Sequence, residues 1–192
     1  MDVARDNILE RVRSALRVPA QQPLPPTTAP IFPPVTNPEA RFREEFATLK
    51  GEFIESGETL AGFLKGFAKI ATDGSDLVGK TVGQANASVR ECDLGVTGCD
   101  CLVAQTGSVI VSTVSAGGRA LSVLPPTHLV IARREQIVPD LATAMAFLRE
   151  RYDKRWPSAL SVITGPSRTA DIEKILVMGA HGPKRLALYF AD

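Results

Sequence analysis

Histidine and cysteine are scarce in this sequence, which contains two histidines and three cysteines among 192 residues. An odd, clustered set of cysteines is a poor disulfide framework. Cys92, Cys99 and Cys101 also lack the Cys-x2-Cys spacing that structural zinc and iron–sulfur sites favour. We therefore expect three reduced thiols, no metal site and no bound cofactor, with a redox-sensitive thiol pair as the alternative.

Excess charge and long apolar runs are also missing. The formal net charge is +1 at pH 7, so no strong field attracts nucleic acid or an anionic membrane. The longest uncharged run, 101–118, is broken by polar residues and three glycines, whereas a membrane span needs about 20 mostly apolar residues. The acidic N-terminus is unlike a signal peptide or a mitochondrial presequence. We expect a cytoplasmic protein that binds neither nucleic acid nor membrane.

The N-terminal part of the chain divides into a helix and a linker. Apolar residues at helical spacing predict an amphipathic helix within residues 1–18. Residues 19–38 hold eight of the fourteen prolines, a composition typical of an extended linker. A short helix on a tether favours exchange between protomers, so a homo-oligomer formed through this helix is one expectation. The folded α/β domain is predicted to occupy residues 39–192.

The body of the chain changes character near residue 93. Before it, helical periodicity predicts helices over 39–51 and 60–70, with Gly62 and Gly66 allowing close approach to a sheet, and a short strand at 53–54. After it, β-branched runs bounded by glycine and polar turns indicate strands. These strands are predicted at 94–96, 102–104, 109–114, 129–132, 160–164 and 186–190, with helices at 139–151 and 169–177.

The last three of these elements predict the sheet topology. Strand 160–164, helix 169–177 and strand 186–190, joined by short connections, suggest a right-handed parallel unit. The run of strands before them suggests a mixed sheet. The fold class is therefore α/β, with a mixed, mainly parallel sheet flanked by helices.

The sharpest local motif follows the strand 160–164. Gly165 permits an unusual turn, after which Ser167, Arg168 and Thr169 meet the N-terminus of the predicted helix. Free amides and the helix dipole favour an anion there, and ligands sit at the carboxyl ends of parallel strands. The motif predicts an anion site, although a helix cap at Thr169 and a structural ion pair of Arg168 explain it equally simply.

Two further turns carry polar groups that can meet a ligand. Gln105, Thr106 and Gly107 form the apex of a predicted hairpin. Gly118 precedes Arg119, whose guanidinium can hold a carboxylate in a bidentate manner. The spacing matches neither a dinucleotide fingerprint nor a phosphate loop.

The two histidines, His128 and His181, both lie at turns. They are candidate acid–base groups because imidazole titrates near neutrality, and solvated or packed side chains are the alternative. No catalytic triad can be assigned by spacing. The predicted ligand-binding residues are Gln105, Thr106, Gly107, Gly118, Arg119, Ser167, Arg168 and Thr169.

From about Leu94 onward the chain resembles the lactate-utilization protein C family, the LUD-domain proteins. The motifs that carry this resemblance are Gly95-Val-Thr-Gly98, Ala104-Gln-Thr-Gly107, Gly118-Arg119, Leu124-Pro-Pro-Thr-His128, Ile137-Val138, Ile163-Thr-Gly-Pro-Ser-Arg-Thr-Ala-Asp-Ile-Glu173 and Gly179-Ala-His-Gly-Pro183.

The resemblance implies a NagB/RpiA/CoA-transferase-like fold. It also implies a subunit or accessory factor of L-lactate oxidation to pyruvate, acting beside iron–sulfur partner proteins, with a small carboxylate or phosphate as ligand. Gln105 stands where the family usually has an acid, which weakens any analogy to covalent transferase catalysis. The alternatives are a stand-alone isomerase or transferase acting on a phosphorylated or CoA-linked substrate, and a non-catalytic interaction module.

Overall fold

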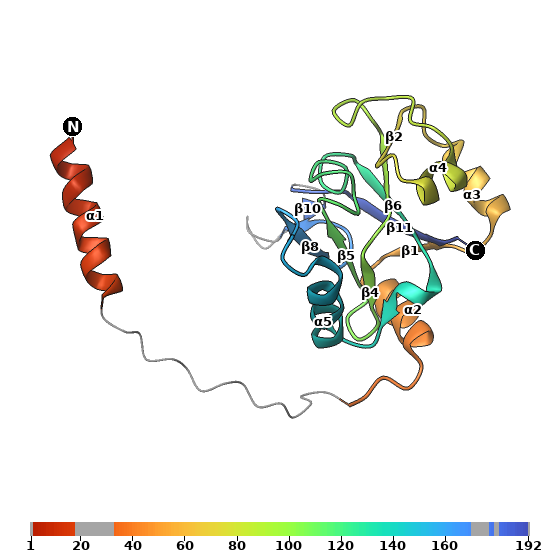
Figure 1. The fold of residues 1–192 in the computed structure, drawn as a ribbon. Helices are drawn as coiled ribbons and strands as arrows, with labels where there is room; N and C mark the ends of the chain where they lie inside the picture. The colour runs from red at the N-terminus through yellow and green to blue at the C-terminus, as the bar shows by residue number, and fades with distance from the viewer. Residues whose placement is uncertain (1, 18–32, 170–176, 179–180, 192) are drawn as a thin grey trace. The chain divides into compact units, whose positions relative to one another are not determined.

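A computed structural model describes residues 2–17, 33–169, 177–178 and 181–191 of the chain. It divides into two compact units, Met1–Pro33 and Pro34–Asp192. The first unit contains the helix α1 (Asp2–Leu16), at the position where the sequence predicts a helix (Figure 1). Within the described part of the chain, no helix has the length and apolar character needed to cross a membrane.

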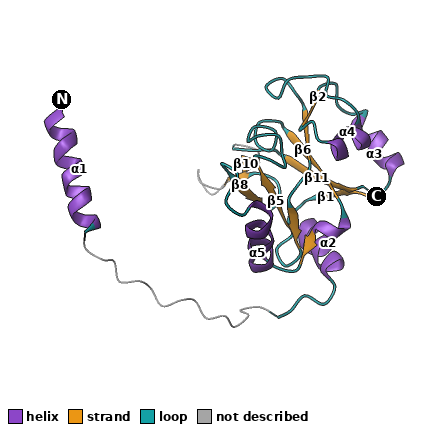
Figure 2. Cartoon of the chain, in the orientation of Figure 1, coloured by secondary structure: helices purple, strands orange, loops and turns teal. Residues whose placement is uncertain are grey.

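The second unit is built on a five-stranded sheet in the order β1-β11-β6-β3-β2. Every neighbouring pair in this sheet is parallel (Figure 2). The predicted α/β class with a mainly parallel sheet is confirmed. The five strands are β1 (Glu52–Ile54), β2 (Ile70–Thr72), β3 (Leu94–Thr97), β6 (Thr127–Ala132) and β11 (Arg185–Phe190).

A second sheet of four strands has the order β7-β4-β5-β8. The pairs β4–β5 and β5–β8 are antiparallel, whereas β4–β7 is parallel. A separate antiparallel pair joins β9 to β10. The strands are β4 (Cys101–Val103), β5 (Ser108–Ser112), β7 (Ile137–Val138), β8 (Leu160–Ile163), β9 (Arg168–Thr169) and β10 (Val177–Met178), with a 3-10 turn, η1, at Arg134–Gln136.

Strand alternation sorts the core into layers. Val130 and Ala132 of β6 pack between the two sheets, together with Phe42 of α2, whereas Leu129 and Ile131 pack on the opposite face. Helices α3 and α4 cover that opposite face, and α5 covers the outer face of the four-stranded sheet. The helices are α2 (Pro38–Thr48), α3 (Gly57–Leu64), α4 (Asp76–Val82) and α5 (Leu141–Tyr152).

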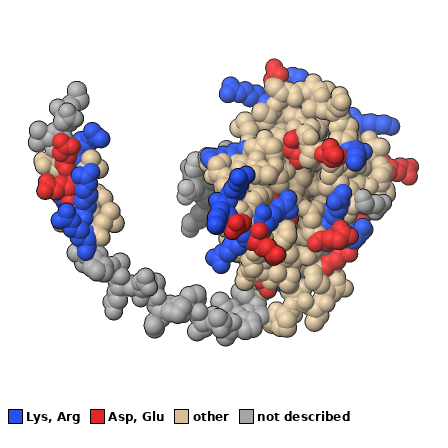
Figure 3. Space-filling view, in the orientation of Figure 1, with Lys and Arg blue, Asp and Glu red and all other residues tan. Residues whose placement is uncertain are grey.

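The surface of the second unit carries charges of both signs. Figure 3 shows acidic and basic side chains interspersed over its visible face. This mixture agrees with the net charge of +1. It provides no single-sign field of the kind that steers a polyanion.

The predicted helix over 60–70 is wrong in its second half. Helix α3 ends at Leu64, and Ile70 begins β2, because the β-branched run Ile70–Thr72 pairs with β3. Gly62 allows no close approach, since a Cβ there would meet nothing within 4 Å. The sequence reading also missed α4, although Ser75 caps it by accepting a hydrogen bond from the backbone N–H of Val78.

The prediction of a helix over 169–177 is wrong at both ends, because Thr169 and Val177 lie in strands. Thr169 pairs with Val177 in the β9–β10 ladder, and residues 170–176 lie outside the described residues. The predicted parallel unit is wrong as well. Strand β8 belongs to the four-stranded sheet, antiparallel to β5, whereas β11 belongs to the five-stranded sheet.

Candidate functional site

A cavity of about 200 Å³ lies between the start of β6, the end of β8 and the start of β11. It brings together two segments that the sequence analysis singled out, the Leu124–His128 motif and the turn after β8. His128, Thr164, Ser167 and His181 all border it. Both candidate histidines and one predicted ligand-binding residue therefore share one site, which we call the His128 cavity.

His128 is the chemically distinctive group of this cavity. Its side chain is fully buried, and its Nε2 lies 2.8 Å from Oγ1 of Thr97. Its Nδ1 is buried and has no hydrogen-bond partner among the described residues. Burial lowers the pKa of His128 from 6.5 to about 4, because the low-dielectric interior disfavours the imidazolium. The side chain is therefore neutral at pH 7, with one ring nitrogen left to donate or accept.

The placement of His128 follows from the alternation of the parallel strands. His128 and Val130 of β6 point to the same face of the sheet. Its register partner in β3 is Gly95. A Cβ on Gly95 would lie 2.5 Å from the carbonyl oxygen of Leu121, so the 121–125 loop closes over this position. Because Gly95 has no side chain, the 121–125 loop can lie close to β3, next to His128.

Hydroxyl groups connect the predicted hairpin to the cavity. The predicted hairpin is present, with Val103 paired to Ser108. Oγ1 of Thr106 lies 2.8 Å from Oγ of Ser108, which in turn lies 2.8 Å from Oγ1 of Thr164 at the cavity wall. Gly107 does not border the cavity. It packs on α2, where a Cβ would lie 2.5 Å from the backbone nitrogen of Phe46.

The anion motif lies at a different edge of the fold from the one expected. The His128 cavity is at the amino ends of β6 and β11, and the backbone N–H of Ser167 donates to the carbonyl of Pro183, 2.8 Å away. Arg168 is exposed in β9. Its Nη2 lies 3.2 Å from the position of a Cβ on Gly165, on the side where that Cβ would also meet the carbonyl oxygen of Leu49, and Arg168 does not border the cavity.

Gly118 and Arg119 are not brought to this cavity. They border a separate cavity of about 240 Å³ next to β2. Nη2 of Arg119 donates to the carbonyl of Ser158 at 3.2 Å. The neighbouring Gly117 allows the loop to approach Asp73 closely, since a Cβ there would lie 2.9 Å from the Cα of Asp73.

Comparison with known proteins identifies the family. The model of the LUD domain matches residues 48–190. The chain belongs to the LUD domain family. The resemblance found in the sequence motifs is thereby confirmed.

Curated relatives of this LUD domain are named for lactate utilization. "Lactate utilization protein C" of Geobacillus sp. (strain WCH70) is 37% identical over 108 residues, which cover 55% of this chain and 45% of that protein. The protein of the same name from Macrococcus caseolyticus is 31% identical over 144 residues, 71% of this chain and 62% of that protein. The chain thus spans about half the length of the first of these relatives.

A solved structure supports the fold of this LUD domain. A DUF162 family protein from Deinococcus radiodurans superposes with a TM-score of 0.57 at 20% sequence identity. The match covers 81% of this chain and 96% of that protein.

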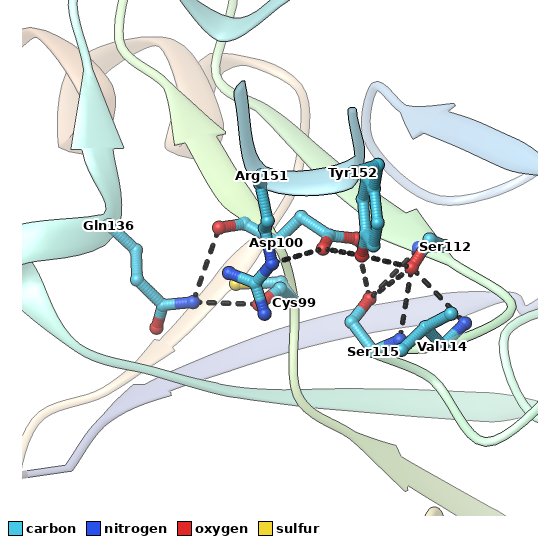
Figure 4. A network of polar contacts seen from close by, with 8 residues as sticks. All are labelled: Cys99, Asp100, Ser112, Val114, Ser115, Gln136, Arg151 and Tyr152. Atoms are coloured by element: carbon cyan, nitrogen blue, oxygen red, sulfur yellow. Dashed lines mark hydrogen bonds and ion pairs between the residues drawn. The ribbon is translucent and has the colours of Figure 1, made fainter. Parts of the chain in front are cut away.

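A second polar cluster in the LUD domain was missed by the sequence analysis. Asp100, between β3 and β4, is fully buried, and Oγ of Ser115 donates to its Oδ2 at 2.7 Å. The hydroxyl of Tyr152 donates to Oδ1, and Nε of Arg151 lies 3.6 Å from the same oxygen (Figure 4). Hydroxyls of Tyr152 and Ser112 lie 2.9 Å apart. The carboxylate thus ties the end of α5 to the turn after β5.

Both carboxylate oxygens of Asp100 accept hydrogen bonds from described residues. Burial raises the pKa of Tyr152, and its bond to the Asp100 carboxylate raises it further. The phenol therefore stays protonated as a donor at neutral pH. The sequence signal was weak, since a lone Asp between two cysteines matches no motif.

All three cysteines of the LUD domain are free and buried. Burial raises the pKa of Cys101 to about 12 and raises that of Cys99 further. Such thiols carry little thiolate at neutral pH, which opposes the redox-sensitive alternative. Within the described ranges, no group of three or more His, Cys, Asp or Glu side chains could hold a metal ion.

Proposed function

We propose that this LUD domain acts in lactate utilization by binding a small 2-hydroxy or 2-oxo acid in the His128 cavity. The observation that carries the proposal is the buried Nδ1 of His128, a residue that borders the cavity and whose Nδ1 pairs with none of the described residues. Leaving a buried polar atom unpaired costs roughly 1–3 kcal/mol, and a ligand that pairs with it recovers that cost. The names of the curated relatives point to lactate as the ligand class.

The size and polarity of the cavity fit a small acid. Its volume of about 200 Å³ is below the roughly 300–1,000 Å³ typical of pockets for drug-sized molecules. Ser167 and Thr164 offer hydroxyl donors to a carboxylate. His128 then meets the oxygen on the second carbon of the acid.

The tautomer of His128 decides which acid binds more tightly. If Nε2–H donates to Thr97, Nδ1 is an acceptor and pairs with the hydroxyl of lactate. If Nε2 accepts from Thr97, Nδ1–H donates and can also pair with the carbonyl of pyruvate. A titration with both acids therefore distinguishes the two tautomers.

Thermal shift of the full chain with lactate, pyruvate and inorganic phosphate tests the proposal. At about 100 times its dissociation constant a ligand adds about 2.7 kcal/mol, roughly 5–10 °C for a domain of this size. His128→Leu should abolish the shift. Arg119→Ala is the matched control and should keep it, since Arg119 borders another cavity. No shift with lactate or pyruvate would reject the proposal.

We also propose that the domain works with iron–sulfur proteins that carry the electrons of lactate oxidation. The resemblance to the lactate-utilization protein C family supports this partner class. Residues 1–33, which form a separate compact unit, are the proposed docking arm, since Ile8 and Leu16 of α1 are exposed. Deleting residues 1–33 should abolish co-purification with such partners and leave the lactate-induced shift intact. Retained co-purification would place the docking surface on residues 34–192.

A further inference from the structure

A second and larger hollow lies at the opposite edge of the five-stranded sheet. This cleft, of about 600 Å³, is bordered by α3, α4 and the residues that follow β6 and β11. Arg133 directly follows β6, and Tyr189 and Ala191 lie at the end of β11. The carboxyl ends of parallel strands are where ligands bind in open α/β sheets. We call it the carboxyl-edge cleft.

Basic groups from two elements face this cleft. Lys80 of α4 and Arg133 both border it, and neither takes part in a salt bridge with any other described residue. Asp76 is the one acid of the wall, so the lining carries a net charge of +1 from two cations and one anion. The wall therefore favours an anionic ligand that also has a group able to pair with a carboxylate.

Donors without charge add to this polar wall. Gly57, the first residue of α3, borders the cleft, and the hydroxyl of Tyr189 lies 3.9 Å from the position of a Cβ on Gly57. The first amides of a helix have no intrahelical acceptor. Together with a guanidinium and an ammonium, such amides are the donors that phosphate groups prefer.

Apart from Thr81, the remaining residues of the cleft wall are apolar and suit an organic group. Leu60 and Leu64 of α3 face Leu77 of α4 across it. The volume of about 600 Å³ lies within the roughly 300–1,000 Å³ of cofactor and metabolite pockets. It is three times the volume of the His128 cavity, about 200 Å³, so the two sites suit ligands of different size.

We infer that the carboxyl-edge cleft binds a phosphorylated small molecule of about nucleotide size. Lys80 and Arg133 hold its phosphates, the leucines of α3 and α4 contact its ring, and Asp76 accepts a hydrogen bond from a hydroxyl or ring amine. The inference goes beyond the proposed binding of a small acid and uses none of its residues.

Titration of the full chain with adenosine diphosphate and with inorganic pyrophosphate tests the inference. Calorimetry gives the affinities, and amide chemical shifts of Gly57, Lys80 and Tyr189 locate the site. Adenosine diphosphate should bind at least roughly tenfold more tightly than pyrophosphate, because only the former fills the apolar wall. The double variant Lys80→Ala/Arg133→Ala should weaken both by at least roughly tenfold.

Controls separate this site from the His128 cavity. Lys65→Ala removes an exposed cation that does not border the cleft and should change nothing. His128→Leu should abolish lactate binding and leave the diphosphate titration unchanged. The inference is overturned if neither probe perturbs the cleft at millimolar concentration, or if the double variant binds as tightly as the native chain. It is also overturned if sulfate perturbs the cleft as strongly as the diphosphate, which would mean an adventitious ion only.

Discussion

Two fully buried polar side chains of this LUD domain, Asp100 and His128, differ in how completely their atoms are paired. Both oxygens of Asp100 accept hydrogen bonds, from Tyr152 and Ser115. His128 borders a cavity, and only one of its ring nitrogens pairs with a described residue. A buried polar group that is fully paired holds the fold together, whereas one left half-paired marks a place where a ligand can supply the missing partner.

Replacing Asp100 should have the largest effect on stability. Asp100→Ala removes two hydrogen bonds to a charged group, each worth roughly 1.5–3 kcal/mol, and leaves Tyr152 and Ser115 with only their contacts to Ser112. We expect the free energy of unfolding to fall by about 3–5 kcal/mol in urea denaturation. Asp93→Ala, at an exposed position, should change it by at most about 0.5 kcal/mol. An equal loss in both variants would contradict the anchoring role of Asp100.

The second prediction concerns the pH dependence that His128 imposes. Its folded pKa is about 4, against an ordinary value of 6.5. As the pH falls from 6.5 towards 4, the unfolded state binds a proton that the folded state excludes. The free energy of unfolding therefore falls, by about 3 kcal/mol at most. This contribution is fully present above pH 6.5.

The measurement compares the native chain with His128→Gln, which keeps an amide near Thr97 but does not titrate. Between pH 7.5 and pH 5 the native chain should lose about 2 kcal/mol more than the variant. Carboxylates titrate alike in both proteins, so their contribution cancels in the difference. Identical pH profiles would mean that His128 is not buried in a neutral form.

Removing one donor from the Asp100 cluster should have a smaller effect. Tyr152→Phe deletes the hydroxyl that donates to the carboxylate but keeps the ring, which packs against the core cluster between α5 and the four-stranded sheet. The free energy of unfolding should fall by roughly 1.5–3 kcal/mol. A double-mutant cycle with Asp100→Ala should give less than the sum of the two losses, because both variants remove the same bond. Full additivity would show that the phenol and the carboxylate act independently.

The sequence predicted the fold best where one physical preference dominated. The strands β3 and β6 contain β-branched residues and are buried on both faces, so their strand character was plain. The secondary structure of residues 60–72 was harder to predict, because helical spacing continues past Leu64 into a segment that pairs as β2. The division of the strands into two sheets was not predictable, since pairing partners are set by long-range packing.

The sequence predicted several residues of the candidate site but not how they are arranged. The chemistry of His128, His181 and Ser167 singled them out, and one cavity brings them together. Arg119 lies elsewhere, because no local pattern reveals which turns share an edge. The unpaired Nδ1 of His128 and the buried carboxylate of Asp100 depend on tertiary contacts, so the sequence could not reveal them.

The smallest effect is expected at the Glu52–Arg185 pair, in which the carboxylate is exposed, unlike the buried carboxylate of Asp100. Nε and Nη2 of Arg185 donate to the two carboxylate oxygens of Glu52 at 2.9 and 2.7 Å, joining β11 to β1. These bonds lower the pKa of Glu52. Both side chains are more than 40% exposed, so water screens the pair and it contributes about 1 kcal/mol or less.

Because the folded pKa of Glu52 is depressed, its contribution is present above the unfolded value near 4.5 and is lost as the pH falls through the folded value. Glu52→Gln should therefore lower the free energy of unfolding by at most about 1 kcal/mol at pH 7 and by less at pH 3. Urea denaturation at both values, with Glu58→Gln as an exposed control, measures this difference. A loss at Glu52 as large as that of Asp100→Ala would remove the distinction between exposed and buried carboxylates on which the comparison rests.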